Sequence, residues 1–297
     1  MKAVNFSVDF ESRPEVMPFF DEQTNTFSYV VKDPFSQACA IVDSVMEIDY
    51  PSGRLSLRGA EEIIRYIRYH SLELQWIIET HVHADHLSAA PYLQQQLGGK
   101  IGIGNKITDV QDSFGKIFNA GTEFSRDGSQ FDQLFNDGDE YLVGNMVCHA
   151  IHTPGHTPAC MVHVMGDAAF VGDTLFMPDG GTARADFPGG DARTLYRSIQ
   201  RVLTLPDNVR LFICHDYMPN GRKAECQTTV GDERRLNIHV GKQVDEDSFV
   251  KMREKRDATL GMPRLILPSL QINMRAGHLP PAEDNGTSYL KLPLNQL

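Results

Sequence analysis

One short segment constrains this chain more than any other: His81, His83, Asp85 and His86 lie within the six residues 81–86. The segment follows an apolar run, residues 74–79, that is typical of a buried strand. In an extended segment, side chains two residues apart share a face, so His81, His83 and Asp85 are expected to point into one pocket. Imidazole and carboxylate groups are the ligands that hold Zn²⁺ or Fe²⁺ in proteins. The segment therefore predicts a metal site at the end of a strand.

Three later segments each present one further metal-ligand residue. His156 lies in the turn Thr-Pro-Gly-His-Thr, Asp173 ends the apolar run Phe-Val-Gly-Asp, and His215 ends the run Phe-Ile-Cys-His. Taken alone, Asp173 or His215 is more often a helix cap or a satisfied loop residue. Joined to the histidine-rich segment, they predict that distant parts of the chain complete the metal site.

Composition limits the class of protein and its partners. The chain has 297 residues, of which 41% are hydrophobic and 23% are charged, as in ordinary globular proteins. Its 28 Lys and Arg against 39 Asp and Glu give a formal net charge of −11, so nucleic acid and anionic membranes are not expected partners. No apolar run approaches the ~20 residues of a membrane helix. The first residues resemble neither a signal nor a transit peptide, so a cytoplasmic location is expected.

The cysteines do not form a metal-binding or disulfide pattern. They are five in number, are widely separated, and include no C-x-x-C pair: Cys39, Cys148, Cys160, Cys214 and Cys226. Each is expected to be a small buried residue in a reducing compartment.

Alternating strand-like and helix-like segments predict a layered α/β sandwich. Strands are expected at 3–9, 26–32, 38–43, 74–79, 100–103, 141–143, 146–152, 159–164, 168–172 and 209–214. Helices are expected at 59–70, from an N-cap at Ser88 to residue 98, within 104–140, at 192–203, near 230–238 and at 248–257. No linker is evident, so we expect 1–220 to form a catalytic core and 221–297 to pack on it as C-terminal helices and a tail.

The order of these motifs resembles the metallo-β-lactamase fold superfamily, over roughly residues 25–275. The HxHxDH signature of that family is matched by residues 81–86, and its later ligands are matched by His156, Asp173 and His215. The resemblance implies an αββα sandwich, with the metals in a cleft at one edge of the two sheets and a C-terminal extension packed on it.

Within the superfamily, the chain resembles the persulfide dioxygenases, which act on glutathione persulfide. The pattern R-x-D-F-x-x-G-D-A-x-x-L-Y-x-S runs from Arg184 to Ser198, and the segments His-Asp-Tyr at 215–217 and Asn-Met-Arg-Ala-Gly at 273–277 agree with it. The chain has Gly-Thr-Ala-Arg where these enzymes more often have Gly-Cys-Gly-Arg, and it has extra residues near 44–53, near 124–137 and in the tail. These departures concern the substrate pocket more than the iron site.

The resemblance implies that one Fe(II) per chain is held by His81, His156 and Asp173. Two histidines and one carboxylate leave positions open on the iron, where the persulfide and O₂ can both bind. The implied reaction oxidises the outer sulfur to the sulfite level and releases glutathione, a step in sulfide detoxification. Zinc is redox-inert and could not support it, although Zn²⁺ can occupy the same ligands in a purified sample.

The remaining ligand-type residues leave two further alternatives open. By the same resemblance, the groups that orient the ligands and hold waters are His83, Asp85, His86 and His215. The residues alone would equally complete a dinuclear hydrolase of the glyoxalase II type, in which a metal-bridging hydroxide cleaves a glutathione thioester. A non-catalytic metal- or thiol-binding protein is the third alternative.

Substrate recognition is expected to depend on a few cationic and polar side chains. Glutathione carries two carboxylates, and a guanidinium group binds a carboxylate through two parallel hydrogen bonds. Arg184 and Arg275 are therefore candidates, although Arg184 could instead pair with a nearby aspartate such as Asp186. Tyr217 is a candidate to donate to the ligand or line the sulfur pocket, and Asn273 is a weaker one. Members of the resembled family are often dimers, so a homodimer is among the expected assemblies.

Overall fold

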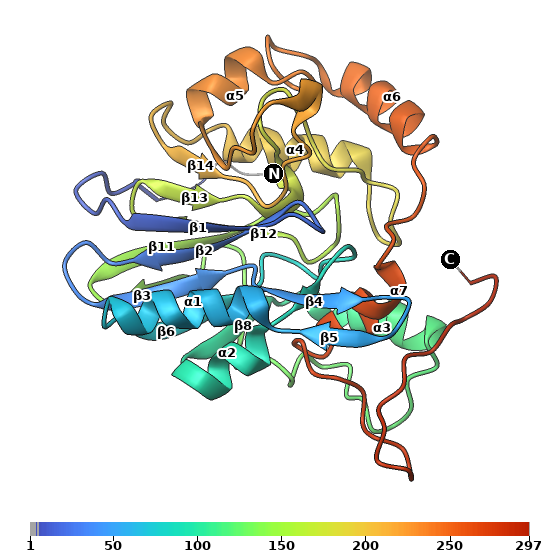
Figure 1. Ribbon diagram of the computed structural model, residues 1–297. Coiled ribbons are helices and arrows are strands. Elements are labelled where there is room, and N and C mark those ends of the chain that lie inside the picture. Colours follow the sequence, from blue (N-terminus) through green and yellow to red (C-terminus); the bar gives the residue numbers. More distant parts are fainter. Residues whose placement is uncertain (1–3, 5, 297) are drawn as a thin grey trace.

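In the computed structural model, which describes residue 4 and residues 6–296, two six-stranded sheets lie face to face. Helices cover the outer side of each sheet (Figure 1). This arrangement confirms the αββα sandwich that the sequence predicts.

The N-terminal half forms the first sheet and its helices. The strand order is β1 (Glu15–Asp21), β2 (Thr26–Lys32), β3 (Ala38–Val42), β6 (Glu73–Ile78), β8 (Lys100–Gly104) and β9 (Gln133–Phe135). The last four of these strands are parallel, which requires crossover connections. The connecting helices are α1 (Arg58–Tyr69), α2 (Ala90–Leu97) and α3 (Ile107–Ile117).

The C-terminal half forms the second sheet. Its order is β10 (Glu140–Val143), β11 (Met146–His152), β12 (Met161–Met165), β13 (Ala168–Phe170), β14 (Arg210–Phe212) and β15 (Gln227–Thr229). The helices on its outer side are α4 (Ala192–Val202), α5 (Val230–Leu236) and α6 (Glu246–Asp257). A short sheet of β5 (Arg54–Ser56), β4 (Val45–Asp49) and β7 (Leu87–Ser88) lies beside the first sheet.

Strand β3 shows how the two faces of a sheet are used. Ile41 packs in the cluster beneath the helices, whereas Ala40 and Val42 pack in the cluster between the two sheets. Because successive side chains of a strand point to opposite faces, a strand covered on both sides is apolar throughout. This explains why the whole of β3 is buried.

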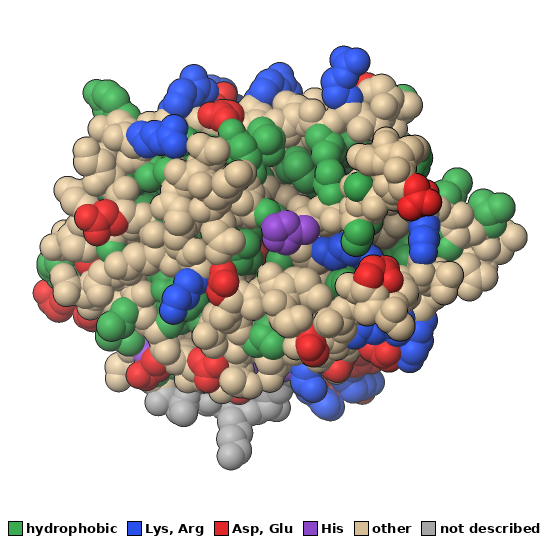
Figure 2. All heavy atoms as spheres, turned by 90° about the horizontal axis from the view of Figure 1, so that it is seen from below, with side chains coloured by type: hydrophobic (Ala, Val, Ile, Leu, Met, Phe, Trp, Pro, Cys, Tyr) green, Lys and Arg blue, Asp and Glu red, His purple; other side chains and the backbone are tan. Residues whose placement is uncertain are grey.

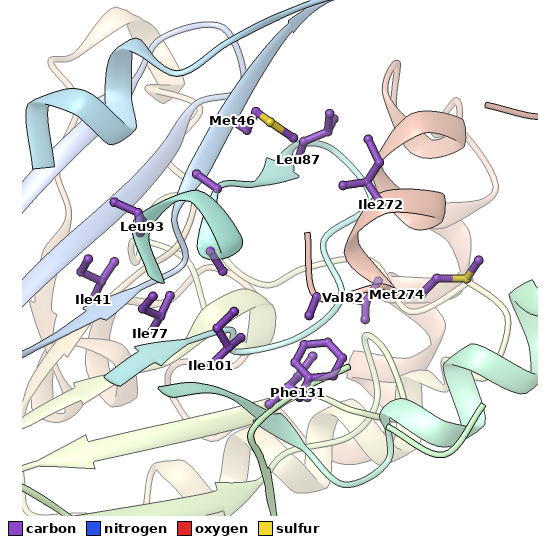
Figure 3. Packing of buried hydrophobic residues seen from close by; sticks show 14 of the residues in the cluster. Ile41, Met46, Ile77, Val82, Leu87, Leu93, Ile101, Phe131, Ile272 and Met274 are labelled. Carbon is purple, nitrogen blue, oxygen red and sulfur yellow. The ribbon is translucent and has the colours of Figure 1, made fainter. Parts of the chain in front are cut away.

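The C-terminal segment is packed into the same interior. Helix α7 (Ile266–Asn273) follows α6, and its Ile272 lies in the cluster under the first sheet together with Met274. Figure 3 shows these two side chains near Val82, which lies within the histidine-rich segment, and Leu87, which directly follows it. The C-terminal residues therefore support the part of the chain that carries the predicted metal ligands.

Two local predictions are wrong. Of the strand expected at 3–9, residues 3 and 5 lie outside the described part, and residues 6–9 form no strand. The first strand is instead β1, where Pro18 is tolerated because β1 lies at the edge of its sheet. Ser88 is not the N-cap of α2: that position is Ala89, and Ser88 lies in β7 while its Oγ accepts a hydrogen bond from the Ala90 N–H.

The surface and the helices agree with the expected lack of a membrane span. Among the described residues, no helix is both long enough and apolar enough to cross a bilayer. On the face drawn in Figure 2, Lys and Arg side chains lie among Asp and Glu side chains, so the positive charges on that face form no continuous patch.

Candidate metal centre

Two residues, Glu79 and Thr80, separate β6 from the histidine-rich segment, which has bends at residues 81 and 84–86. Asp43, which follows β3, holds its start: the Thr80 N–H donates to Asp43 Oδ1 over 2.8 Å, and the Thr80 hydroxyl donates to Oδ2 over 2.9 Å. The segment is therefore not an extended strand. Its ligand-type atoms divide between two groups, with His81 in one and His83 and Asp85 in the other.

The first group consists of His81, His156 and Asp173, whose ligand atoms lie within 4.8 Å of one another. Asp173 Oδ2 is 3.8 Å from His81 Nε2 and 3.5 Å from His156 Nε2. The three residues come from the segment after β6, from the turn between β11 and β12, and from the 3-10 turn Gly172–Thr174 after β13. All three are buried.

Backbone features orient two of these side chains, His156 and Asp173, toward each other. His156 Nδ1 lies 2.8 Å from the carbonyl oxygen of Arg184. A carbonyl oxygen only accepts, so Nδ1 carries the proton and the lone pair of Nε2 is directed toward Asp173. Asp173 follows Gly172, whose φ of +49° is left-handed and favours glycine.

The second group consists of His83, Asp85, His86 and His215. His215 Nε2 lies 3.3 Å from Asp85 Oδ2 and 3.4 Å from Asp173 Oδ1. Asp173 thus presents Oδ2 to the first group and Oδ1 to the second. Such a carboxylate lies where it could serve either group or connect them.

Several atoms of this cluster that could bind a metal are buried and have no hydrogen-bond partner among the described residues. They are His83 Nδ1, His86 Nε2, Asp173 Oδ1 and His215 Nε2. An unpartnered buried polar atom costs about 1–3 kcal/mol, so four in one place call for a ligand. Imidazole nitrogens and a carboxylate that converge at this spacing fit a transition-metal ion, and the cluster is a metal-binding site.

Burial also sets the protonation of these residues. Desolvation lowers the pKa of His81 well below its usual range, and the neighbouring His83 and His156 lower it further. Desolvation likewise lowers the pKa of His83, with the adjacent His86 acting in the same direction. Both imidazoles are therefore neutral near pH 7 and have a lone pair available for a metal.

The acidic members respond in opposite directions. Desolvation raises the pKa of Asp173, against the influence of His215 and His156. Burial would also raise the pKa of Asp85, but His215, His86 and His83 together outweigh it and hold that pKa below its usual range. His215 shows the reciprocal effect: burial opposes its charge, yet Asp85 and Asp173 raise its pKa.

A cavity of about 450 Å³ opens onto both groups and is lined by Asp85, His156 and Asp173. Two of the residues that the sequence nominates for substrate binding line the same cavity. Tyr217 is 56% exposed, and its ring stacks on His215 with centroids 6.0 Å apart. Arg184 also lines it, but its guanidinium is occupied: Nε and Nη2 bind Asp186 at 2.6 and 2.7 Å.

The other two residues that the sequence suggests for substrate binding do not line this cavity. Arg275 is mostly buried, its guanidinium lies 4.3 Å from the centre of the Phe124 ring, and its Nη1 donates to the Gln271 carbonyl. Asn273 is buried as well, and none of its atoms lines the cavity. Neither position could be read from the sequence, because both depend on how the C-terminal segment returns to the core.

Asn273 holds the metal-site segment through the backbone. Its Nδ2 donates to the carbonyl oxygens of His83 and His86 over 2.8 and 2.7 Å, and its Oδ1 accepts from the Ser88 N–H over 2.8 Å. The side chain therefore positions the segment and does not contact the cavity.

Sequence reasoning missed two residues that hold the histidines. His83 Nε2 lies 3.0 Å from Asp43 Oδ1, and Thr26 Oγ1 lies 3.4 Å from His86 Nδ1 and 3.2 Å from His215 Nδ1. Asp43 could have been identified from the sequence, since it follows an apolar strand just as Asp173 does. Thr26 could not.

The cysteines agree with the sequence. Cys226 is half-buried and the other four are buried, and none forms a disulfide in the described part of the chain. Burial raises the pKa of Cys160, close to His156, to about 12, so it is a thiol at neutral pH.

Comparison with known proteins places this geometry in a family. Residues 22–215 match the model of the metallo-beta-lactamase superfamily, so the chain belongs to that superfamily. A probable metallo-hydrolase of Burkholderia pseudomallei is 56% identical over 94% of this chain and 98% of its own. Glyoxylase B2 of Dictyostelium discoideum is 46% identical over 97% of this chain and 98% of its own.

More distant matches include a redox branch. The mitochondrial persulfide dioxygenase ETHE1 of Bos taurus is 29% identical over 87% of each chain. The crystal structure of ETHE1 from Myxococcus xanthus superimposes with a TM-score of 0.71 at 27% identity, covering 89% of this chain and 100% of that one. The relatives thus carry names of both hydrolases and a dioxygenase.

Proposed function

We propose that this member of the superfamily is an Fe(II)-dependent persulfide dioxygenase, which converts glutathione persulfide, O₂ and one water to sulfite and glutathione. The proposal is carried by the first group, His81, His156 and Asp173. Two imidazoles and one carboxylate from three separate segments match the facial triad of non-haem iron oxygenases. The similarity to ETHE1 of Bos taurus supports the same assignment.

The residues of the chain prepare this group for iron and a sulfur substrate. Neutral His81 needs no deprotonation before a metal binds, and the Arg184 carbonyl sets the direction of His156. When bound, Fe(II) supplies the redox chemistry that lets O₂ react with the persulfide sulfur. Phe176 and Phe187 line the cavity and limit the access of water, which would otherwise compete for the reacting groups.

The cavity also suits a substrate of this size. Its volume of about 450 Å³ falls in the range of small-molecule sites. Tyr217 places a phenol at the exposed side, where it can donate to a ligand. A protein that merely stores metal would not need a cavity leading to its ligands, so we favour catalysis over the non-catalytic alternative.

The second candidate is a dinuclear hydrolase of the glyoxalase II type. It is favoured by the second group, because His83, Asp85, His86 and His215 could hold another ion while Asp173 connects the two sites. The name of the Dictyostelium relative agrees with it. Such an enzyme would need two metals per chain, whereas the dioxygenase needs one.

An oxygen electrode separates the two candidates. Metal-free protein is loaded anaerobically with Fe(II) and given glutathione persulfide, and a zinc-loaded sample is the control. We expect oxygen uptake with the appearance of sulfite in the iron sample and none in the zinc sample. The absence of uptake by iron-loaded protein, together with hydrolysis of S-lactoylglutathione by the dizinc form, would overturn the dioxygenase assignment.

A further inference from the structure

We propose that Arg256 and Arg264 form the anion-binding rim of the cavity and recognise the carboxylates of the thiol that carries the persulfide. This inference rests on the proposed function for the nature of the ligand. It begins from an imbalance in charge pairing along one wall of the cavity.

Four arginines line the cavity: Arg184, Arg253, Arg256 and Arg264. Two of them are neutralised within the fold. Arg184 binds Asp186 with two nitrogens, and Arg253 binds Asp257 at 2.6 Å while donating to the Thr182 carbonyl at 3.0 Å. These two pairs belong to the wall itself and leave no guanidinium hydrogen-bonding edge for a ligand carboxylate there.

Arg256 and Arg264 are different, since both are exposed and neither has an ion pair or hydrogen bond to its guanidinium in the described residues. Many exposed or half-exposed arginines elsewhere on this acidic protein have acidic partners, although Arg54 and Arg68 have none among the described residues. Arg193 and Arg222, for example, lie 2.6 and 2.7 Å from carboxylate oxygens. Arg256 and Arg264 are thus two unpaired guanidinium groups on the same cavity wall as the two paired ones.

The residues that line the cavity differ in exposure between its inner end and its mouth. The donors that face the metal site, His156 and Asp173, are buried, whereas Arg256 and Arg264 are exposed at the mouth. An elongated anionic thiol would be oriented by this difference, with its carboxylates at the arginines and its sulfur toward the buried donors. Arg256 and Arg264 match the two carboxylates of glutathione in number and in sign.

Arg184 has a positioning role in this arrangement. Its Nη1 donates to the Gly261 carbonyl over 2.7 Å, and Gly261 lies in the connection between α6 and α7 that also carries Arg264. The pair of Arg184 with Asp186 thus braces the segment that presents Arg264. Through this contact, Arg184 can shape the cavity without touching the substrate.

The test measures binding of glutathione itself to zinc-loaded protein by calorimetry, so that it does not depend on oxidation. We expect Arg256→Ala and Arg264→Ala each to weaken binding by about tenfold. Arg54→Ala is the matched control, because Arg54 on β5 is exposed, has no ion pair with any described residue and does not line the cavity. Its binding constant should equal that of the unaltered protein.

Glutathione ethyl ester, which lacks one carboxylate charge, shows which of the two arginines binds that carboxylate. The ester should bind the unaltered protein more weakly than glutathione does, and this difference should disappear in one of the two arginine variants. In the oxygen assay, the same variants should raise KM for glutathione persulfide and leave kcat within about twofold.

The outcomes separate this inference from the proposed function. Arginine variants that bind glutathione as tightly as the Arg54→Ala control would overturn the rim assignment, whether or not the protein consumes oxygen. Conversely, arginine-dependent binding of glutathione without oxygen uptake would retain the rim and reject the dioxygenase.

Discussion

At the scale of single residues, Asn273 connects the end of α7 to the segment that carries the metal ligands. Its side chain satisfies two carbonyl groups and one N–H of the segment 83–88, all of them buried. An amide is the one uncharged side-chain group that can both donate twice and accept at such a position. The segment that carries His83 and His86 is thereby held without a charge next to the metal.

Replacing Asn273 by alanine should leave three backbone groups without partners. At about 1–3 kcal/mol for each buried group, and with some relaxation, we expect a loss of ~3 kcal/mol in the free energy of unfolding. Urea denaturation measures it, and Asn145→Ala, at an exposed side chain, should change the value by less than about 0.5 kcal/mol. Equal stability of the two variants would show that water replaces the Asn273 amide without cost.

At the scale of elements, the metal ligands lie in turns that follow strands. One of these turns, at Gly172, is held by close packing against a neighbouring segment. A Cβ atom at Gly172 would lie 2.6 Å from the Thr80 hydroxyl, which itself binds Asp43. The turn that carries Asp173 is therefore locked against the start of the histidine-rich segment. Gly172 is needed both for its positive φ and for the space that it leaves.

Gly172→Ala should separate these two requirements when it is compared with Gly53→Ala. Gly53 has a similar φ of +66°, but nothing lies within 4 Å of the place that a Cβ atom would take there. Gly53→Ala should cost only the left-handed strain of about 1 kcal/mol, whereas Gly172→Ala should cost more and reduce the bound metal, because Asp173 must move. Metal content and denaturation midpoints measure both effects. Full metal occupancy in Gly172→Ala would contradict this account of the turn.

Helix α5 contributes a buried acid that couples stability to pH. Burial raises the pKa of Glu233 from 4.5 to about 8, although Asn237 donates a hydrogen bond to it. Between these values the folded protein binds a proton that the unfolded chain has lost, so stability should fall as pH rises from about 5 to 8.

The slope for this one group is at most about 1.4 kcal/mol per pH unit, and Glu233→Gln should remove it. Unfolding free energies of both proteins at pH 5.5 and pH 8 give the difference in slope. Parallel pH profiles would show that Glu233 does not keep its proton in the folded state.

At the scale of the whole molecule, we propose that residues 221–297 fold as part of the same domain as residues 1–220. Phe249 lies in the cluster under the second sheet, and Leu270, Ile272 and Met274 lie in the cluster under the first. Each such side chain contributes about 1.5–3 kcal/mol by burial, so together they rival the typical stability of a whole domain.

Deleting residues 221–297 should therefore abolish cooperative unfolding. Deleting only residues 280–297 is the matched control, because the described residues of this stretch are mostly exposed. Thermal unfolding followed by circular dichroism should show a transition for the shorter deletion and none for the longer one. A cooperative transition in the chain 1–220 would contradict a single domain.

Much of this molecule could be predicted from local pattern. The strands at 26–32 and 146–152 have the predicted bounds, and each predicted ligand after a strand lies in the metal cluster. Helix α7 was not predicted, because it contains Pro268 and is buried on nearly every side, which leaves no helical period to read. The place of Asn273 depends on contacts across 185 or more residues, which no local pattern contains.

The comparison of His156→Ala with His215→Ala in the oxygen electrode tests the central claim most directly. Both iron-loaded variants are given glutathione persulfide after their iron content is measured. If the group of His81, His156 and Asp173 alone holds the reacting metal, His156→Ala should lose iron and all detectable oxygen uptake. His215→Ala should keep its iron and remain within about tenfold of the unaltered rate. Equal loss in both variants, with two metals bound by the unaltered chain, would contradict the account and favour the dinuclear hydrolase.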